Sequence, residues 1–338
     1  FPGWQTPGFS DDDWQPVTVF DPPEMALVAQ NGPTVRRIQE IQPVTDPIEI
    51  PERNRSRWIF DFGQNMVGRV RLRVNGPAGA TVTLRHGEVL DAEGHLYTEN
   101  LRGAQQTDHY TLRGEGEETY EPHFTFHGFR YVELSGLPHP PTRETLTGLV
   151  LHSDMPRTGT FKCSNPLVNQ LQHNIVWGQK GNFVDVPTDC PQRDERLGWT
   201  GDAQVFVRTA TFNMNVAPFF TKWQQDLAEA QHASGGIPPF APDTHRFEPN
   251  GPKPTGGPAW EDAFIICPWT IHLCYGDRRL LAAHYRALAR FIDYLDAKVS
   301  PGKFPIEGGE SMPGGYGDWL ATDVPPDQRV SATPKDLI

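Results

Sequence analysis

The chain carries the stretch Val70-Arg71-Leu72-Arg73-Val74-Asn75-Gly76-Pro77-Ala78-Gly79-Ala80-Thr81-Val82-Thr83-Leu84. Apolar residues alternate with arginines before the central break and with threonines after it, which is the two-residue period of a half-buried β-strand. The break itself, Asn75–Gly79, has the Gly and Pro content of a hairpin or turn. The stretch therefore predicts two antiparallel strands joined by a tight connection.

The same period extends from Arg57 to about Ser153, with a second turn signal at Arg113–Gly116. We therefore expect an antiparallel β-sandwich over residues 53–155. Residues 1–52 hold many prolines and few periodic apolar segments, so we expect them to be the tail of an N-terminal β-sandwich module plus a linker.

After Ser153 the apolar period changes to 3.6, which predicts helices. Ser164 is placed to cap the first of them, with Pro166 near its start. Its expected apolar stripe is Leu167, Leu171 and Ile175. Further helices are expected near 202–213, 216–231, 261–275 and 277–297. The last of these has an expected stripe of Leu281, Tyr285, Leu288, Ile292 and Leu295. Residues 156–338 thus predict an α/α arrangement with long Gly- and Pro-rich loops and no strand signal between helices.

Composition excludes several classes of protein. The 338 residues include 42 acidic and 30 basic side chains, a formal net charge of -12, which argues against a nucleic-acid partner. No run approaches the ~18 apolar residues of a membrane span, so no membrane partner is expected. The four cysteines show no CxxC spacing, and His123 and His127 share an expected strand face where packing roles are commoner than ligation. We expect no metal and no cofactor; oligomeric state and localisation stay open.

The chemistry is concentrated in Val186-Pro187-Thr188-Asp189-Cys190-Pro191-Gln192-Arg193-Asp194-Glu195-Arg196-Leu197-Gly198-Trp199-Thr200-Gly201-Asp202. This expected loop holds four carboxylates, two arginines and one Trp between Asp189 and Asp202. One interpretation is a solvated lattice of salt bridges. The other is glycoside hydrolysis, which needs a protonated carboxyl as general acid, a carboxylate that activates water, and polar groups that hold ring hydroxyls. Clustered carboxylates raise a pKa toward neutrality, as the second interpretation requires.

Two more loops place a Trp beside an acid at a helix end: Pro258-Ala259-Trp260-Glu261-Asp262 and Tyr316-Gly317-Asp318-Trp319. Each Trp alone fits a core position equally well. Three such loops in one domain favour a carbohydrate cleft.

The Asp189–Asp202 stretch resembles the signature of bacterial α-L-rhamnosidases, glycoside hydrolase family 78. Four other segments are similar to the same family: Asn174–Gln179, Phe60–Asn65, His127–Tyr131 and Trp4–Pro16. The resemblance covers essentially the whole chain. It implies an antiparallel β-sandwich followed by the first part of an (α/α)6 barrel.

The resemblance also implies an inverting hydrolase that removes terminal α-L-rhamnose from plant glycosides or polysaccharides. By motif, Glu195 resembles the general acid. The residues that resemble the lining of the rhamnose pocket are Asp189, Arg193, Trp199 and Asp202. Further cleft residues by resemblance are Trp260, Asp262 and Trp319. The family's general base is a Glu in the second half of the barrel, so the resemblance implies an internal fragment whose base lies beyond Ile338.

Two other functions remain open on the residues alone. The chain is also compatible with a carbohydrate-binding fragment that turns nothing over, given its β-sandwich and Trp-rich loops. Another (α/α)6 glycosidase, or a polysaccharide lyase with a Tyr or His base, is the second alternative.

Overall fold

The computed structural model describes residues 3–22, 24–51, 56–244 and 255–298, together with Thr322 and Pro325. Residues 1–30 form one unit and residues 31–338 a second. In the first unit the described chain is mostly exposed and makes turns, such as Trp14 N donating to Asp11 O at 2.9 Å. The ring of Phe9 meets that of Trp14 edge-on at 5.7 Å.

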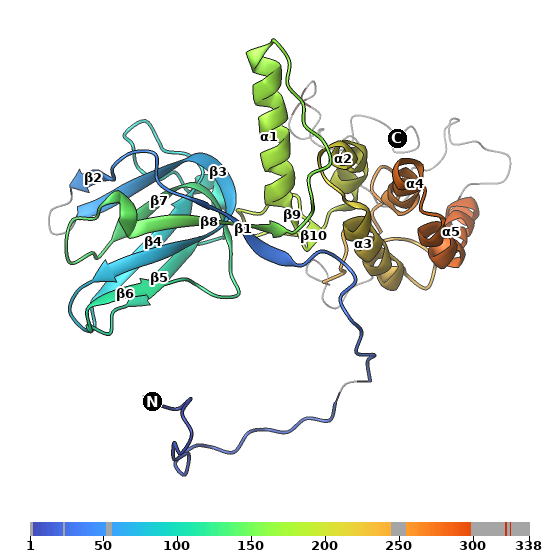
Figure 1. Ribbon diagram of the computed structural model, residues 1–338. Coiled ribbons are helices and arrows are strands. Elements are labelled where there is room, and N and C mark those ends of the chain that lie inside the picture. The colour runs from blue at the N-terminus through green and yellow to red at the C-terminus, as the bar shows by residue number, and fades with distance from the viewer. Residues whose placement is uncertain are drawn as a thin grey trace. The chain divides into compact units, whose positions relative to one another are not determined.

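The second unit begins with an antiparallel sheet (Figure 1). Its strands, within the described residues, are β1 (Val35–Ile41), β2 (Ile48–Pro51), β3 (Ser56–Asn75), β4 (Thr81–Gly87), β5 (Thr107–Thr111), β6 (Glu117–Tyr120), β7 (His127–Ser135) and β8 (Leu146–Ser153). Short 3-10 turns lie at η1 (Glu99–Leu101) and η2 (Arg143–Thr145). The expected β-sandwich is therefore present.

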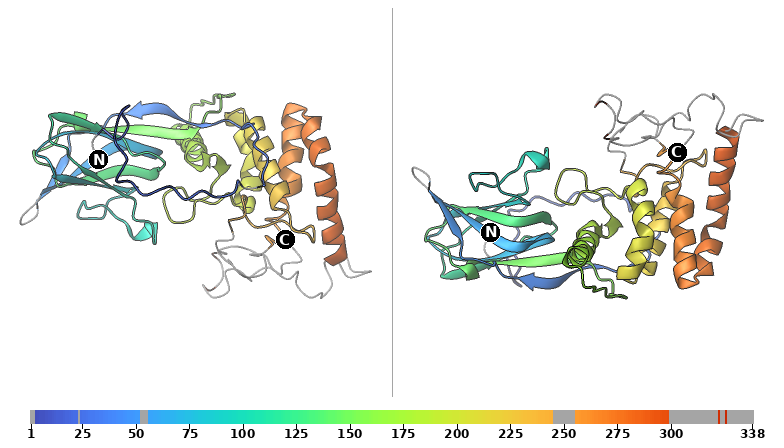
Figure 2. Two further views of the ribbon diagram at one scale, coloured as in Figure 1. Left: turned by 90° about the horizontal axis from the view of Figure 1, so that it is seen from below. Right: turned by 90° about the horizontal axis from the view of Figure 1, so that it is seen from above.

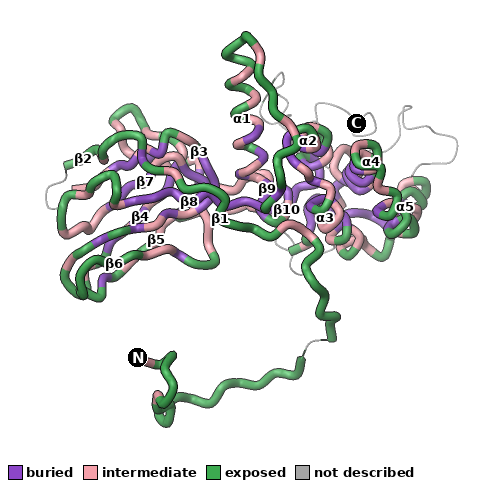
Figure 3. The backbone as a smooth tube through the Cα atoms, viewed as in Figure 1, coloured by how far each residue is buried: buried purple, intermediate pink, exposed green. Residues whose placement is uncertain are grey.

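The long strand β3 belongs to both layers of the sandwich. Its first half, up to Asp61, pairs with β2 and β7, and its second half, from Gly68, pairs with β8 and β6. The register shifts between Asp61 and Met66, where Gly63 has φ of +69°. Buried side chains of these strands, among them Phe60, Phe62 and Phe129, form one apolar cluster. Figure 3 shows the corresponding buried stretches of the strands.

Glycine is required at the point where β3 changes partners. Gly68 pairs with His127 of β7 and with Val150 of β8. A Cβ on Gly68 would lie 1.9 Å from Leu149 O. No side chain other than hydrogen fits there.

The two turns predicted from sequence are not hairpins. The strands on either side of Asn75–Gly79 are β3 and β4, and β4 pairs instead with β5 and β7. Likewise β5 and β6, on either side of Arg113–Gly116, pair with β4 and β3 respectively. Both turns carry the chain from one layer to the other. The sheet also includes two strands before residue 53, where the sandwich was expected to start, because β1 pairs with β8 and β2 pairs with β3.

Helices follow the sheet. They are α1 (Pro166–Asn182), α2 (Thr200–Asn213), α3 (Ala217–Ala230), α4 (Ala263–Tyr275) and α5 (Arg278–Lys298). The predicted helices are confirmed to within two residues at each end. A two-residue hairpin, β9 (Phe183–Val184) and β10 (Val186–Pro187), interrupts the helical region where no strand was expected. No helix among the described residues has the length and apolarity to cross a membrane.

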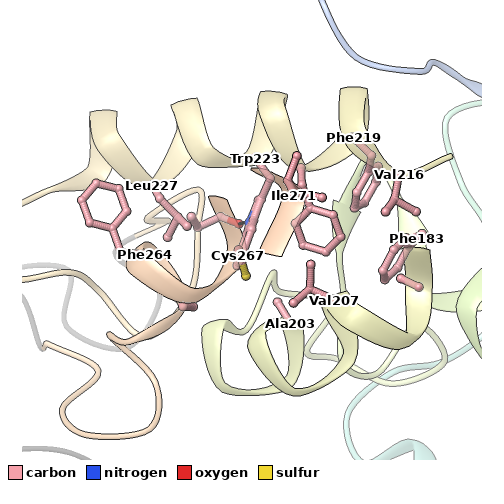
Figure 4. Packing of buried hydrophobic residues seen from close by; sticks show 14 of the residues in the cluster. Phe183, Ala203, Val207, Val216, Phe219, Trp223, Leu227, Phe264, Cys267 and Ile271 are labelled. Atoms are coloured by element: carbon pink, nitrogen blue, oxygen red, sulfur yellow. Dashed lines mark hydrogen bonds between the residues drawn. The ribbon is translucent and has the colours of Figure 1, made fainter. Parts of the chain in front are cut away.

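Helix α4 contacts α2, α3 and α5, and α1 contacts β3 and β8 (Figure 2). The helices share an apolar core in which Trp223 of α3 is fully buried, with its Nε1 donating to Ala241 O at 3.1 Å (Figure 4). Phe219 of α3 stacks on Phe183, the first residue of β9, at 4.6 Å. The core thus fixes the ends of the loop that runs from β10 to α2.

Three expectations about these helices are wrong in detail. The N-cap of α1 is Asn165, whose side chain accepts from Leu167 N at 2.9 Å, and not Ser164. Leu167 and Leu171 are exposed rather than buried. On α5 the buried side chains are one position off the expected stripe. They are Leu280, His284, Phe291 and Tyr294, while Tyr285 and Ile292 are exposed.

Candidate active site

The loop between β10 and α2 is held closed by hydrogen bonds at its base. Thr188 donates from its backbone N–H and its hydroxyl to Asn182 O, at 2.8 and 2.9 Å. Asp189 N donates to Leu197 O at 3.3 Å, and Thr200 N donates to Pro239 O at 2.9 Å. Residues 190–196 therefore form one compact loop that is closed at its base.

This closure brings three predicted residues together. Arg193 Nη2 lies 2.8 Å from Glu195 Oε2 and 3.9 Å from Asp189 Oδ2. One oxygen each of Asp189 and Glu195 lie within 4.8 Å of one another. Arg193 thus bridges two carboxylates that would otherwise repel. This arrangement is compatible with both interpretations of the loop, the lattice of salt bridges and the glycosidase site. Arg193 makes the ion pairs that the first needs, and it holds the two carboxylates close together as the second needs.

The sandwich contributes to this cluster. Arg102, which follows η1, places Nη1 at 3.3 Å from Glu195 Oε2. Arg196, the residue after Glu195, donates from Nη2 to Gln106 Oε1 at 3.2 Å and to Phe126 O at 2.8 Å. Sequence reasoning missed both sandwich partners, because nothing in the pattern of residues 102–126 signals a contact with residues 195–196.

A cavity of about 800 Å³ adjoins the cluster. Asp189 lines it together with Asp202 and Gln204 of α2 and with Trp260. Among the described residues, Asp189 Oδ1 and Asn182 Oδ1 are buried acceptors without a hydrogen-bond partner. The wall therefore offers acceptors for hydroxyl groups beside a flat aromatic face.

Two carboxyls of this cavity hold their protons more strongly than usual. Burial raises the pKa of Asp189, and the negative charge of Glu195 acts in the same direction. Asp202 keeps an exposed surface, yet the surrounding wall withdraws its carboxyl from water and raises its pKa, helped by the charge of Asp189. Burial also raises the pKa of the neighbouring Cys190 thiol.

Glu195 and Arg193 line a second cavity of about 370 Å³, together with Asp108 and His127 of the sandwich. Asp189 is thus the predicted residue that links the acid cluster to the larger cavity.

Two other predicted site residues, Trp199 and Asp262, do not line either of these cavities. Trp199 is buried against Phe240, with ring centroids 5.3 Å apart, and Trp260 packs on the same small cluster. Asp262 accepts from Ala259 N at 2.9 Å and so holds the turn that carries Trp260. Trp319 falls outside the described residues, as does Asp318 beside it.

Within the part of the chain that the structure describes, two groups of side chains are spaced closely enough to share a metal ion. In the first, the rings of His86 and His127 stack 4.0 Å apart, which prevents both from aiming lone pairs at one ion. His127 lies at the start of β7, and His123 precedes the strand rather than sharing its face. The second group is Asp189, Cys190 and Glu195, where Arg193 supplies the positive charge. Neither group favours a metal.

Comparison with known proteins agrees with the fold. Residues 156–338 match the model of the bacterial α-L-rhamnosidase 6 hairpin glycosidase domain, and residues 52–152 match the bacterial α-L-rhamnosidase concanavalin-like domain. An α-L-rhamnosidase from Streptomyces avermitilis is 46% identical over 99% of this chain, which spans 30% of that protein.

Two solved structures are similar over the whole chain. The S. avermitilis α-L-rhamnosidase complexed with L-rhamnose gives a TM-score of 0.85 at 44% identity, with 100% of this chain and 30% of that chain covered. The α-L-rhamnosidase from Dictyoglumus thermophilum gives 0.87 at 35% identity, with coverages of 100% and 36%. These matches confirm the expected fold class, a β-sandwich followed by the first part of an (α/α)6 barrel. The chain belongs to the bacterial α-L-rhamnosidase family.

Proposed function

We propose that the protein carrying this chain is an inverting glycoside hydrolase that removes terminal α-L-rhamnose from glycosides or polysaccharides, with Glu195 as general acid. The observation that carries the proposal is the cluster of Asp189, Arg193 and Glu195 beside a cavity walled by Asp202 and Trp260. The S. avermitilis relative is an α-L-rhamnosidase whose structure holds L-rhamnose, which supports the choice of sugar.

The cavity suits a 6-deoxy sugar. Its acceptor oxygens, Asp189 Oδ1 and Asn182 Oδ1, are available to ring hydroxyls, and Trp260 offers an apolar face to the ring and its methyl group. Arg193 orients Glu195 by a charge-assisted hydrogen bond of 2.8 Å. In this proposal Trp199 supports Trp260 from behind, and Asp262 fixes the turn before it.

The spacing of the two acids favours a base from elsewhere. An inverting mechanism holds its carboxyls ~6.5 to 9.5 Å apart so that water fits between them. Oxygens of Asp189 and Glu195 lie within 4.8 Å, which is too close for that geometry. We therefore assign Asp189 to binding, and we place the base beyond Ile338, as the resemblance implies.

The test is Glu195→Gln in the full-length protein. We expect hydrolysis of alkyl α-L-rhamnosides to fall by about 10²- to 10⁴-fold, while calorimetry still detects L-rhamnose binding. The matched control is Glu144→Gln, at an exposed glutamate in η2. Undiminished hydrolysis by the Glu195 variant would refute the acid assignment. Binding without turnover by the unsubstituted full-length protein would favour the carbohydrate-binding alternative.

Stereochemistry tests the base assignment separately. Proton NMR of the first-formed product should show β-L-rhamnose, because inversion at the anomeric carbon follows from direct attack by water. First-formed α-L-rhamnose would instead indicate a covalent intermediate, with Asp189 as the nearest nucleophile to Glu195.

A further inference from the structure

Gln106 of the sandwich occupies a buried position where each of its polar side-chain atoms is used. It lies just before β5 and is 5% exposed. Its Nε2 donates to Gly128 O at 2.9 Å. Its Oε1 accepts from His127 Nδ1 at 2.9 Å and from Arg196 Nη2 at 3.2 Å. The amide thus joins β7 to the loop that carries Glu195.

The orientation of the amide is itself fixed. His127 has its other nitrogen, Nε2, 2.9 Å from Asp108 Oδ2 of β5. His86 of β4 stacks on the His127 ring, and its Nδ1 lies 3.0 Å from the backbone oxygen of Gln106. Three strands therefore hold Gln106 in one conformation.

Arg196 needs such an anchor because its backbone is in the left-handed region, with φ of +53°. A non-glycine residue keeps that conformation only where surrounding contacts impose it. The guanidinium is held by two neutral oxygens, Gln106 Oε1 and Phe126 O, and its carbon lies 4.3 Å from the centroid of the Phe126 ring. Release of this side chain would free the backbone next to Glu195.

We propose that Gln106 is a positioning residue for Glu195. It anchors Arg196 and thereby fixes the backbone that aims the Glu195 carboxyl, while Arg102 from the same sandwich segment contacts that carboxyl directly. The sandwich is in this way part of the catalytic apparatus. The inference rests on the proposed role of Glu195 as general acid.

The test is Gln106→Met in the full-length protein, which keeps the length of the side chain and removes its acceptor. A misaimed acid matters most when the leaving group needs a proton. We expect kcat for an alkyl α-L-rhamnoside to fall on the order of 10²-fold, and kcat for the 2,4-dinitrophenyl rhamnoside to fall less than about 3-fold. Gln106→Glu, which keeps an acceptor oxygen for Arg196, should restore most of the loss. Gln105→Met, at the exposed neighbouring glutamine, is the matched control.

The outcomes separate this inference from the proposed function. If Glu195→Gln lowers kcat equally for the alkyl and the 2,4-dinitrophenyl rhamnoside, the acid assignment itself is wrong. The positioning role is refuted by a different pattern. In it, Glu195→Gln lowers kcat more for the alkyl rhamnoside than for the 2,4-dinitrophenyl rhamnoside, while Gln106→Met lowers kcat for both equally or for neither. Should Gln106→Met not fold, Arg196→Met breaks the same contact from the other side and should show the same selective loss. Failure of both variants to fold would overturn the proposal, because the contact would then maintain the fold rather than aim the acid.

Discussion

Acidification should destabilise the sandwich through His86. The side chain is 1% exposed, and burial together with the nearby His127 lowers its pKa from 6.5 to about 3. The unfolded chain therefore binds a proton at this residue between pH 6.5 and about 3, while the folded chain does not. Stability is retained above pH 6.5 and lost as the pH falls through this window. Each pH unit within it is worth about 1.4 kcal/mol, so the step from pH 7 to pH 5 removes about 2 kcal/mol.

The measurement is urea unfolding followed by far-ultraviolet circular dichroism at pH 7 and pH 5. The His86→Gln variant removes the titrating group and isolates its share from that of the carboxylates. We expect the stability difference between unsubstituted protein and variant to shrink by about 2 kcal/mol on acidification. The matched control is His123→Gln, at an exposed histidine. A His86→Gln difference that is the same at both pH values would refute the reasoning.

Two further substitutions probe the sheet. Glu133 is 2% exposed and accepts from Arg57 and Arg85 at 2.8 and 2.9 Å, so Glu133→Gln should lower the free energy of unfolding by about 2 kcal/mol in urea titration. The exposed Glu117→Gln should change it little, and equal effects would contradict a role for the buried ion pairs. Gly68→Ala should cost about 3 kcal/mol or more, because the new Cβ meets Leu149 O at 1.9 Å. Its matched control is Gly178→Ala in α1, where an added Cβ would meet no atom within 4 Å apart from the neighbouring residues of its own helix. An equal fall in thermal midpoint for both variants would show that close packing is not the cause.

Local periodicity predicted the bounds of the helices well. It predicted poorly which strands pair and which helix faces are buried. The helix bounds follow from short-range signals, and α2 ends at the expected Asn213. The buried face of α5 was misplaced because Tyr285 continues the apolar period but is exposed, whereas the side chain that is buried next to it is the polar His284. Only the packing of α5 against α4 selects between the two faces. The hairpin or turn signal at Asn75–Gly79 corresponds to a turn and not to a hairpin, because a turn sequence does not determine which strand the chain pairs with next.

The same division applies to the candidate site. Asp189, Arg193 and Glu195 were predicted together because one short loop carries them, and the loop closes on itself through Asp189 N and Leu197 O. Arg102 and Gln106 escaped prediction because they reach that loop from a different domain. Contacts between residues so far apart in sequence form only when the β-sandwich packs against the helical region, and no local sequence pattern encodes that packing.

The shared strand β3 has a consequence for synthesis of the protein. Its partners β7 and β8 lie at residues 127–153, so β3 leaves the ribosome well before the strands that complete either layer. During that interval β3 can pair with β2, which precedes it, but its apolar side chains, including Phe60 and Leu72, still lack β7 and β8. Nascent chains with a long unpaired strand are prone to associate with one another. Association between partly made chains is therefore most favoured in the interval between the synthesis of β3 and that of β7 and β8.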